Sequence, residues 1–233
     1  MFVLDHQRVI TPFETATGPE QVAKFALQKV GHALLKMRLQ FSIALTPGSA
    51  GSGNSVGRSG QSVARFCDWV GKRILKRVEM IYNTNSIQKI TGKQIYDESL
   101  LREETEDTLE AIGDLEGGDL TMSQREFAAN GAAPAANTVG TTITYTVELP
   151  MFNTVDASYA LQVNALSHDP TLEIEFEKAV NIIETDFASA NYTLSNLKLK
   201  CFYINMTQED KAHIVGEILQ RKDGFLYMML VSI

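Results

Sequence analysis

The sequence predicts an all-β domain, an antiparallel sandwich whose sheets enclose one core. Three observations predict it. Apolar and polar side chains alternate with a period of two in several separate segments, which is typical of half-buried strands. The 233 residues are 44% hydrophobic and 21% charged, a composition that suits a packed core. The length fits a single sandwich, because such domains commonly reach about 200 to 250 residues.

The N-terminal part is predicted to be an arm followed by a long strand. We expect residues 1–28 to form the arm, with residues 1–20 irregular. The next segment alternates over its full length and places six apolar residues on one face: Leu35, Met37, Leu39, Phe41, Ile43 and Leu45. The strand should end at Pro47, and the Gly- and Ser-rich stretch 46–62 is predicted to be a flexible loop.

A second strand is predicted from the segment FCDWVGKRILKRVEMIYN, residues 66–83. Val78, Met80 and Tyr82 lie on one side of this strand, and the run Asn83-Thr84-Asn85 supplies a turn. Its positive charges are concentrated in four side chains: Lys72, Arg73, Lys76 and Arg77. On a strand these four positions divide between two faces, so we interpret them mainly as strand-edge or interface charge, and nucleic-acid binding with Trp69 as a stacking platform is the alternative.

Residues 97–119 interrupt the β pattern and are predicted to form a helix, because Leu101, Leu109 and Ile112 recur at helical spacing. Ten of these 23 residues are Asp or Glu, against the single Arg102. We call this stretch the acidic segment. It is interpreted as a solvated insertion on the outside of a sheet, or alternatively as a contact surface for a basic partner. A loop of small residues follows, so the insertion as a whole covers 97–140.

Three further strands are predicted in the second half of the chain. In residues 142–149, Ile143, Tyr145, Val147 and Leu149 share one face. In residues 172–177, apolar positions oppose a row of three glutamates, Glu173, Glu175 and Glu177. In residues 191–205, four residues alternate with lysines: Leu197, Leu199, Cys201 and Tyr203.

The end of the chain is predicted to hold a short helix after the capping residue Thr207, followed by an apolar tail, FLYMMLVSI, at 225–233. An exposed strand of this kind is an aggregation risk, so the tail is expected to pack against this chain or another one. Residues 207–233 are therefore treated as a separate C-terminal unit.

Catalytic and metal-binding patterns are not recognisable in the sequence. The four histidines, His6, His32, His168 and His213, lie far apart, and His168 is interpreted as a turn residue with local hydrogen bonds. The Gly-rich loop lacks the spacing and the lysine of a phosphate-binding loop, since it carries Arg58 instead. We therefore predict no catalytic residue, no cofactor-binding residue and no metal ligand, and we expect no enzyme activity and no cofactor.

The net charge and the cysteine content limit the classes of partner and of chemical environment that suit this chain. A net charge of −7 argues against a surface devoted to nucleic acid, because phosphate binding needs concentrated Lys and Arg. Cys67 and Cys201 have no partner at metal-ligand spacing and are expected to be buried free thiols. No apolar run reaches the length of a membrane span, so none is predicted. A carbohydrate-binding sandwich, with Trp69, Tyr82 and Tyr159 in a shallow site, is the alternative of another class.

Four stretches, in this order, resemble a known protein family. They are HALLKMRLQFSIALTP, RFCDWVGKRILKRVEMIYNTNSIQKITGKQIYD, VELPMFNTVDASYALQVNALSHDPTLEIEFEKA and LKLKCFYINMTQEDKAHIV. Together they span residues 30–215 and resemble the major capsid proteins of nucleocytoplasmic large DNA viruses. Members of that family usually carry two jelly rolls, and this chain resembles the N-terminal one.

The resemblance implies an eight-stranded antiparallel jelly-roll sandwich over residues 29–206, with the C-terminal unit as a possible link to a second jelly roll. It implies a structural virion protein of the icosahedral capsid, assembled in the host cytoplasm. Its expected partners are other capsid subunits, in a trimeric capsomer or a pentamer, and minor capsid proteins, without direct nucleic-acid contact. A single-jelly-roll penton or minor capsid protein is the alternative within the same lineage.

Overall fold

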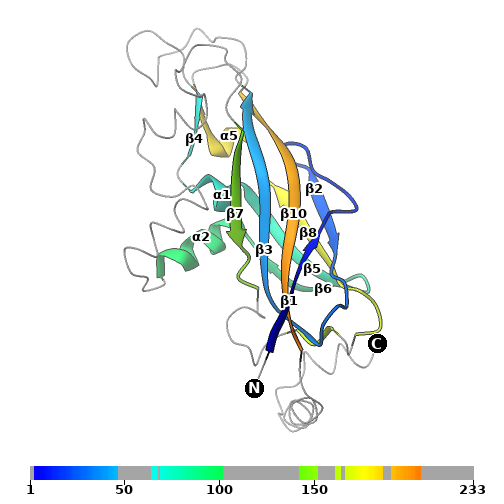
Figure 1. Cartoon of the computed structure of the whole chain (residues 1–233). Helices are drawn as coiled ribbons and strands as arrows, with labels where there is room; N and C mark the ends of the chain where they lie inside the picture. Colours follow the sequence, from blue (N-terminus) through cyan, green and yellow to red (C-terminus); the bar gives the residue numbers. More distant parts are fainter. Residues whose placement is uncertain are drawn as a thin grey trace.

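Two four-stranded antiparallel sheets face each other across one main core (Figure 1). The computed structural model describes residues 3–46, 64–67, 69–101, 142–151, 161–163, 166–185 and 190–205. Sheet A contains, in spatial order, β1 (Val3–Ile10), β10 (Asn191–Asn205), β3 (Ala33–Thr46) and β7 (Ile143–Glu148). Sheet B contains β2 (Val22–Ala26), β8 (Thr171–Phe176), β5 (Leu75–Tyr82) and β6 (Asn85–Ile90).

The order of these eight strands is that of a jelly roll. The chain passes from β1 in sheet A to β2 in sheet B and back to β3, makes the β5–β6 hairpin in sheet B, and then alternates again through β7, β8 and β10. Two interlocked Greek keys of this kind define the jelly roll. The predicted eight-stranded sandwich is therefore confirmed.

Smaller elements lie beside the sandwich. β4 (Ala64–Phe66) and β9 (Ile183–Thr185) pair as a two-stranded sheet. The helices are α1 (Val70–Arg73), α2 (Gly92–Leu101) and α5 (Ala179–Ile182). Figure 1 shows α1 and α2 on the side of the molecule where β7 lies, with β4 and α5 above them.

The core is built from the apolar faces that alternation predicts. β3, β7, β8 and β10 each turn one face inward, and those residues are almost fully buried: Met37, Leu39, Phe41, Ile43, Leu45, Tyr145, Val147, Leu149, Leu172, Ile174, Phe176, Leu197, Leu199, Cys201 and Tyr203. Phe41 reaches across the sandwich, with its ring 6.2 Å from that of Phe176 on the opposite sheet. The predicted faces are therefore confirmed for β8 and β10 and, apart from the partly buried Leu35 and Ile143, for β3 and β7.

The pairing of β3 with β10 contains two irregularities that change which face is apolar. One lies between Phe202 and Tyr203, where the register shifts. Beyond it, Ile204 and Ala33 form a second, small apolar cluster against which Leu35 packs. Leu35 is consequently only partly buried, whereas Leu34 lies in the main core. A bulge lets both faces of the sheet bury apolar side chains at this end.

The β5–β6 hairpin confirms the predicted turn. Asn83 and Thr84 both have positive φ, 49° and 79°. Two consecutive residues in this region are typical of a type I′ turn, whose twist matches that of the flanking strands.

The N-terminal expectation of an irregular first 20 residues is wrong. β1 pairs along its length with β10, and β2 pairs with β8, so the region supplies an edge strand to each sheet. Ile10 and Phe25 from these strands are buried in the core. β1 shows little alternation in the sequence, because Val9 and Ile10 are both apolar. Of the three positions Arg8, Val9 and Ile10, only Ile10 is buried.

The prediction of a continuous strand over residues 66–83 is also wrong. The chain leaves β4, takes a left-handed conformation at Trp69 with φ 55°, and makes the single helical turn of α1 before β5 begins.

The predicted helix of the acidic segment begins earlier than expected, at Gly92. Thr91 and Gln94 cap it reciprocally: the Gln94 backbone N–H donates to Thr91 Oγ1 at 3.2 Å, and the Thr91 backbone N–H donates to Gln94 Oε1 at 2.8 Å. This is a capping box with glutamine at its third position. Only residues 97–101 of the acidic segment fall inside the described part of the helix.

Several sequence predictions fall outside the described residues. They concern the Gly- and Ser-rich loop beyond Thr46, the remainder of the insertion up to residue 141, Tyr159, and the C-terminal unit 207–233.

Candidate functional site

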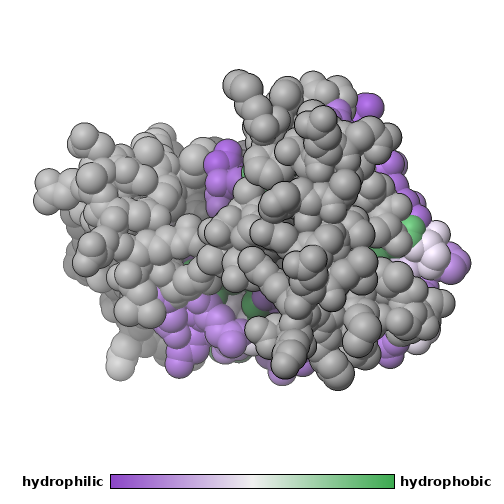
Figure 2. Space-filling model, turned by 90° about the horizontal axis from the view of Figure 1, so that it is seen from below, coloured by the Kyte–Doolittle hydropathy of each residue, from purple (hydrophilic) through white to green (hydrophobic). Residues whose placement is uncertain are grey.

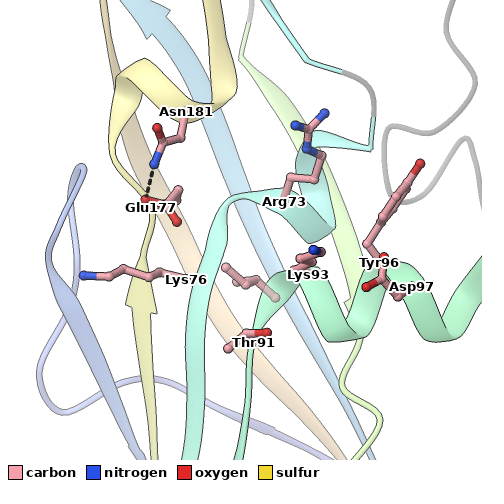
Figure 3. Close-up of a pocket in the computed structure, with 9 residues that line it drawn as sticks. Arg73, Lys76, Thr91, Lys93, Tyr96, Asp97, Glu177 and Asn181 are labelled. Carbon is pink, nitrogen blue, oxygen red and sulfur yellow. Dashed lines mark hydrogen bonds between the residues drawn. The ribbon is translucent and has the colours of Figure 1, made fainter.

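A polar pocket of about 640 Å³ lies where α1, the start of α2 and α5 meet the end of β5 (Figure 3). Nine residues line it: Arg73, Leu75, Lys76, Thr91, Lys93, Tyr96, Asp97, Glu177 and Asn181. The close approach of the elements depends on Gly92, since a Cβ there would lie only 2.0 Å from the Leu75 carbonyl oxygen. Glycine is required because no larger residue fits this junction.

Some of the charged groups of the pocket form hydrogen bonds or ion pairs. Lys76 donates to Glu175 Oε1 at 2.5 Å on the outer face of sheet B. The Asn181 side chain donates to Glu177 Oε1 at 2.8 Å, a bond drawn in Figure 3. Asp97 lies on α2, away from Glu177 in that view. The two carboxylates lie apart in that view, and the nine lining residues include no Ser, Cys or His.

The four clustered basic residues of the sequence do not form one patch. Lys72 is only 3% exposed, with its ammonium 4.6 Å from the centre of the Trp69 ring. Arg73 and Lys76 line the pocket, whereas Arg77 lies on the outer face of sheet B and contacts Glu79 and Glu175. A short helix followed by a strand separates side chains that are neighbours in sequence.

Two of the aromatic residues of the carbohydrate alternative, Trp69 and Tyr82, are not brought together, and the third, Tyr159, lies outside the described residues. The Trp69 ring is engaged by Lys72 and lies 6.3 Å from the Tyr96 ring. Tyr82 is buried at the other end of β5, and the Ser167 N–H donates to its hydroxyl oxygen at 3.0 Å. β5 is eight residues long, so its two ends lie about 23 Å apart. Trp69 and Tyr82 therefore cannot line one shallow site.

The other polar candidates have structural surroundings. His168 Nδ1 lies 2.9 Å from the Ser167 hydroxyl, so its predicted local hydrogen bonding is confirmed. Both cysteines are buried and neither forms a disulfide, as predicted. Burial raises the pKa of the Cys201 thiol to about 12, which keeps it protonated and unreactive at neutral pH. In the described ranges, no three His, Cys, Asp or Glu side chains gather closely enough to hold a metal ion.

Charges on the outer face of sheet B are paired with one another. Lys24 contacts Glu14 at 2.9 Å and Glu173 at 3.6 Å. Glu175 accepts from Lys76 and from Arg77, the latter at 3.2 Å. The hydrogen bond from Lys76 is the main cause that lowers the pKa of Glu175. Two glutamates of the predicted row, Glu173 and Glu175, are therefore neutralised by bases of β2 and β5.

Charges on the outer face of sheet A are not balanced. Strand pairing places Lys200 beside Arg38, which in turn lies beside Glu148. Glu148 contacts Lys36 at 2.5 Å and Arg38 at 3.5 Å. We call Lys36, Arg38, Lys198 and Lys200, with Glu148, the basic face. Its formal charge is +3, four cations less one carboxylate.

Two of these cations have no ion pair or hydrogen bond within the part of the chain that the structure describes, namely Lys198 and Lys200. Apolar side chains lie among them: Val9 is 52% exposed opposite Lys200, and Phe202 lies 5.6 Å below the Arg38 guanidinium. The basic face was not predicted. Its only signal in the sequence is that two distant strands each carry two basic residues on their polar side.

Seen from below, most of the visible described residues are hydrophilic, with only small hydrophobic areas between them (Figure 2). Among the described elements, no helix has the length and apolar character that crossing a membrane requires.

Comparison of the fold with solved structures finds viral capsid proteins. The Faustovirus major capsid protein matches 91% of this chain with a TM-score of 0.66 at 12% identity. The capsid of PBCV-1 virus, as a quasi-atomic model, matches 92% of this chain with a TM-score of 0.61 at 14% identity. No protein-family model and no curated protein matches the sequence.

At these identities the likeness concerns the fold. The matched part covers 56% of the Faustovirus chain and 45% of the PBCV-1 chain, so this chain spans about half the length of the structures it matches. The resemblance noted in the sequence to capsid proteins of large DNA viruses thus extends to the three-dimensional structure.

Proposed function

We propose that this chain is a structural protein of an icosahedral viral capsid and that it acts by self-assembly into capsomers in the virion. The observation that carries the proposal is the jelly-roll fold of the two sheets, which is similar to a major capsid protein over 91% of the chain. Fold alone does not determine function. The proposal therefore also relies on the chemistry of the described surface, where the polar groups are arranged as ion pairs and exposed charge.

A structural role agrees with how the side chains are used. In the pocket between the helices and β5 the Asn181 side chain donates to Glu177, and burial keeps the Cys201 thiol protonated. We propose accordingly that the protein is not an enzyme and needs no cofactor. The domain division into an arm (1–28), a jelly roll (29–206) and a C-terminal unit (207–233) is retained as part of the proposal, with β1 and β2 of the arm included in the sheets.

The proposed partners are other capsid subunits and minor capsid proteins. A trimer is the first expectation and a pentamer the second, because closed rotational symmetry is the rule for such assemblies. Assembly in the host cytoplasm is part of the same proposal. A single-jelly-roll penton or minor component would use the same fold with a different symmetry.

The mass of the purified full chain should be measured by light scattering over a concentration series. We expect a defined oligomer, with three copies indicating a capsomer and five a vertex component. A mass that stays at one copy at every concentration would contradict self-assembly by this chain alone. Screening the same sample on a glycan array tests the carbohydrate alternative, and saturable sugar binding by the monomer would favour it.

A further inference from the structure

The basic face is an unmatched charge on an otherwise acidic chain. The whole chain has a formal charge of −7 and the basic face has +3, so the remainder carries −10. On sheet B every described outer glutamate has a basic neighbour, whereas Lys198 and Lys200 on sheet A have none among the described residues. Cations left unpaired on a flat sheet can be neutralised by a second surface.

We propose that the basic face docks the acidic segment, residues 97–119, of a second copy of this chain. The proposal rests on the proposed self-assembly and names the surfaces that mediate it. The acidic segment has ten carboxylates against one arginine, a formal charge of −9. It is the strongest concentration of negative charge in the sequence, and the basic face is the complementary surface.

The geometry of the basic face favours an acidic peptide over a nucleic acid. Single-stranded nucleic acid is held by several aromatic platforms within a basic groove. Here Phe202 is partly covered by Arg38, and Val9 adds an apolar patch beside Lys200. The acidic segment offers matching apolar residues, Leu109, Ile112 and Leu115, between its carboxylates.

Docking in trans can be tested by complementation between two full-length variants. The first, Lys198→Glu/Lys200→Glu, reverses charge on the basic face and leaves the acidic segment intact. The second neutralises the segment through Glu103→Gln, Glu104→Gln, Glu106→Gln and Asp107→Asn and leaves the basic face intact. The matched control for the first is Lys89→Glu/Lys178→Glu, which changes the net charge equally but lies on sheet B and beside it.

Association is followed by sedimentation velocity at low and at moderate salt, and thermal unfolding confirms that each variant is folded. Each variant alone should need about tenfold more protein than the parent chain to associate, while the control behaves as the parent. An equimolar mixture of the two variants should associate better than either alone, because one copy supplies the segment and the other the basic face. Added salt should weaken association of the parent chain.

Two results would overturn this inference while leaving self-assembly intact. In the first, the parent chain associates and both variants associate equally well, so other surfaces mediate assembly. In the second, each variant associates poorly but their mixture shows no recovery. Binding of a short double-stranded DNA that is lost in Lys198→Glu/Lys200→Glu, with association unchanged, would assign the basic face to nucleic acid instead. A parent chain that stays monomeric contradicts the proposed function itself.

Discussion

The outer faces of the two sheets carry similar numbers of cations but use them differently. On sheet B, Lys24 and Lys89 flank a cross-strand row with Glu173 and Glu79 at its centre. On sheet A the equivalent row runs from Val9 through Lys200 and Arg38 to a single carboxylate, Glu148. The cations and carboxylates on sheet B pair with one another, whereas the outer face of sheet A has an excess of cations. The difference indicates that sheet B is stabilised by its charges, whereas the charges of sheet A are available to a partner.

The largest expected effect on stability comes from a substitution on the inner face of β8. The effects expected on the two outer faces are smaller than this one. Phe176→Ala should lower the free energy of unfolding by about 3 to 5 kcal/mol, because the ring is fully buried against Phe41. Chemical denaturation of the purified protein measures it. A loss below about 1 kcal/mol would mean that the two sheets do not share the core described above.

An intermediate effect is expected on the outer face of the same strand. Glu175→Gln should cost about 1 kcal/mol at neutral pH, since the carboxylate contacts both Lys76 and Arg77. The folded-state pKa of Glu175 lies below its ordinary value, chiefly through the hydrogen bond from Lys76. Its contribution is therefore complete above the unfolded-state pKa of about 4.3 and is lost as the pH falls through the lowered folded-state value.

The unfolding free energy of the parent chain and of Glu175→Gln should therefore converge as the solution is acidified. Glu20→Gln is the control, because Glu20 forms only an exposed pair with Lys178 at 3.4 Å. Parallel pH profiles for the parent and Glu175→Gln would show that the charges of sheet B do not stabilise it, and the contrast between the faces would disappear.

The smallest effect on stability is expected on sheet A. Lys198→Ala/Lys200→Ala should change the free energy of unfolding by no more than about 0.5 kcal/mol, because neither ammonium has a partner among the described residues. Thermal or chemical unfolding at a concentration where the protein is monomeric measures it. A loss comparable to that of Glu175→Gln would show that these lysines are structural and would remove the argument for an external partner.

The strands with strict alternation were predictable from the sequence, and the edges were not. β3 and β8 bury every second residue for almost their whole length, so the pattern is unambiguous. β1 and β2 are edge strands, one with weak alternation and the other only five residues long, and neither rises above the background of an irregular arm. The capping box Thr91-Gln94 was a readable signal for the start of α2.

The candidate surface was harder to predict than the fold. Arg38 and Lys200 are neighbours only because β10 pairs with β3, a contact between residues more than 150 positions apart. The cluster at 72–77 looked stronger in the sequence, but a helical turn and a strand divide it. Local density of charge is a weak guide in a jelly roll, since non-local pairing decides which side chains share a face.

The turn between β5 and β6 is a place where a substitution can make the fold more stable. Thr84 is β-branched and yet holds a φ of 79°, a conformation in which glycine is far more comfortable. The hairpin thus tolerates a local strain at an exposed tip of sheet B, in the other sheet from β3 and β10. A search for a hardier variant of the protein, suited to storage or to display of foreign peptides, should begin at this tip, because changes there leave the docking chemistry of sheet A untouched.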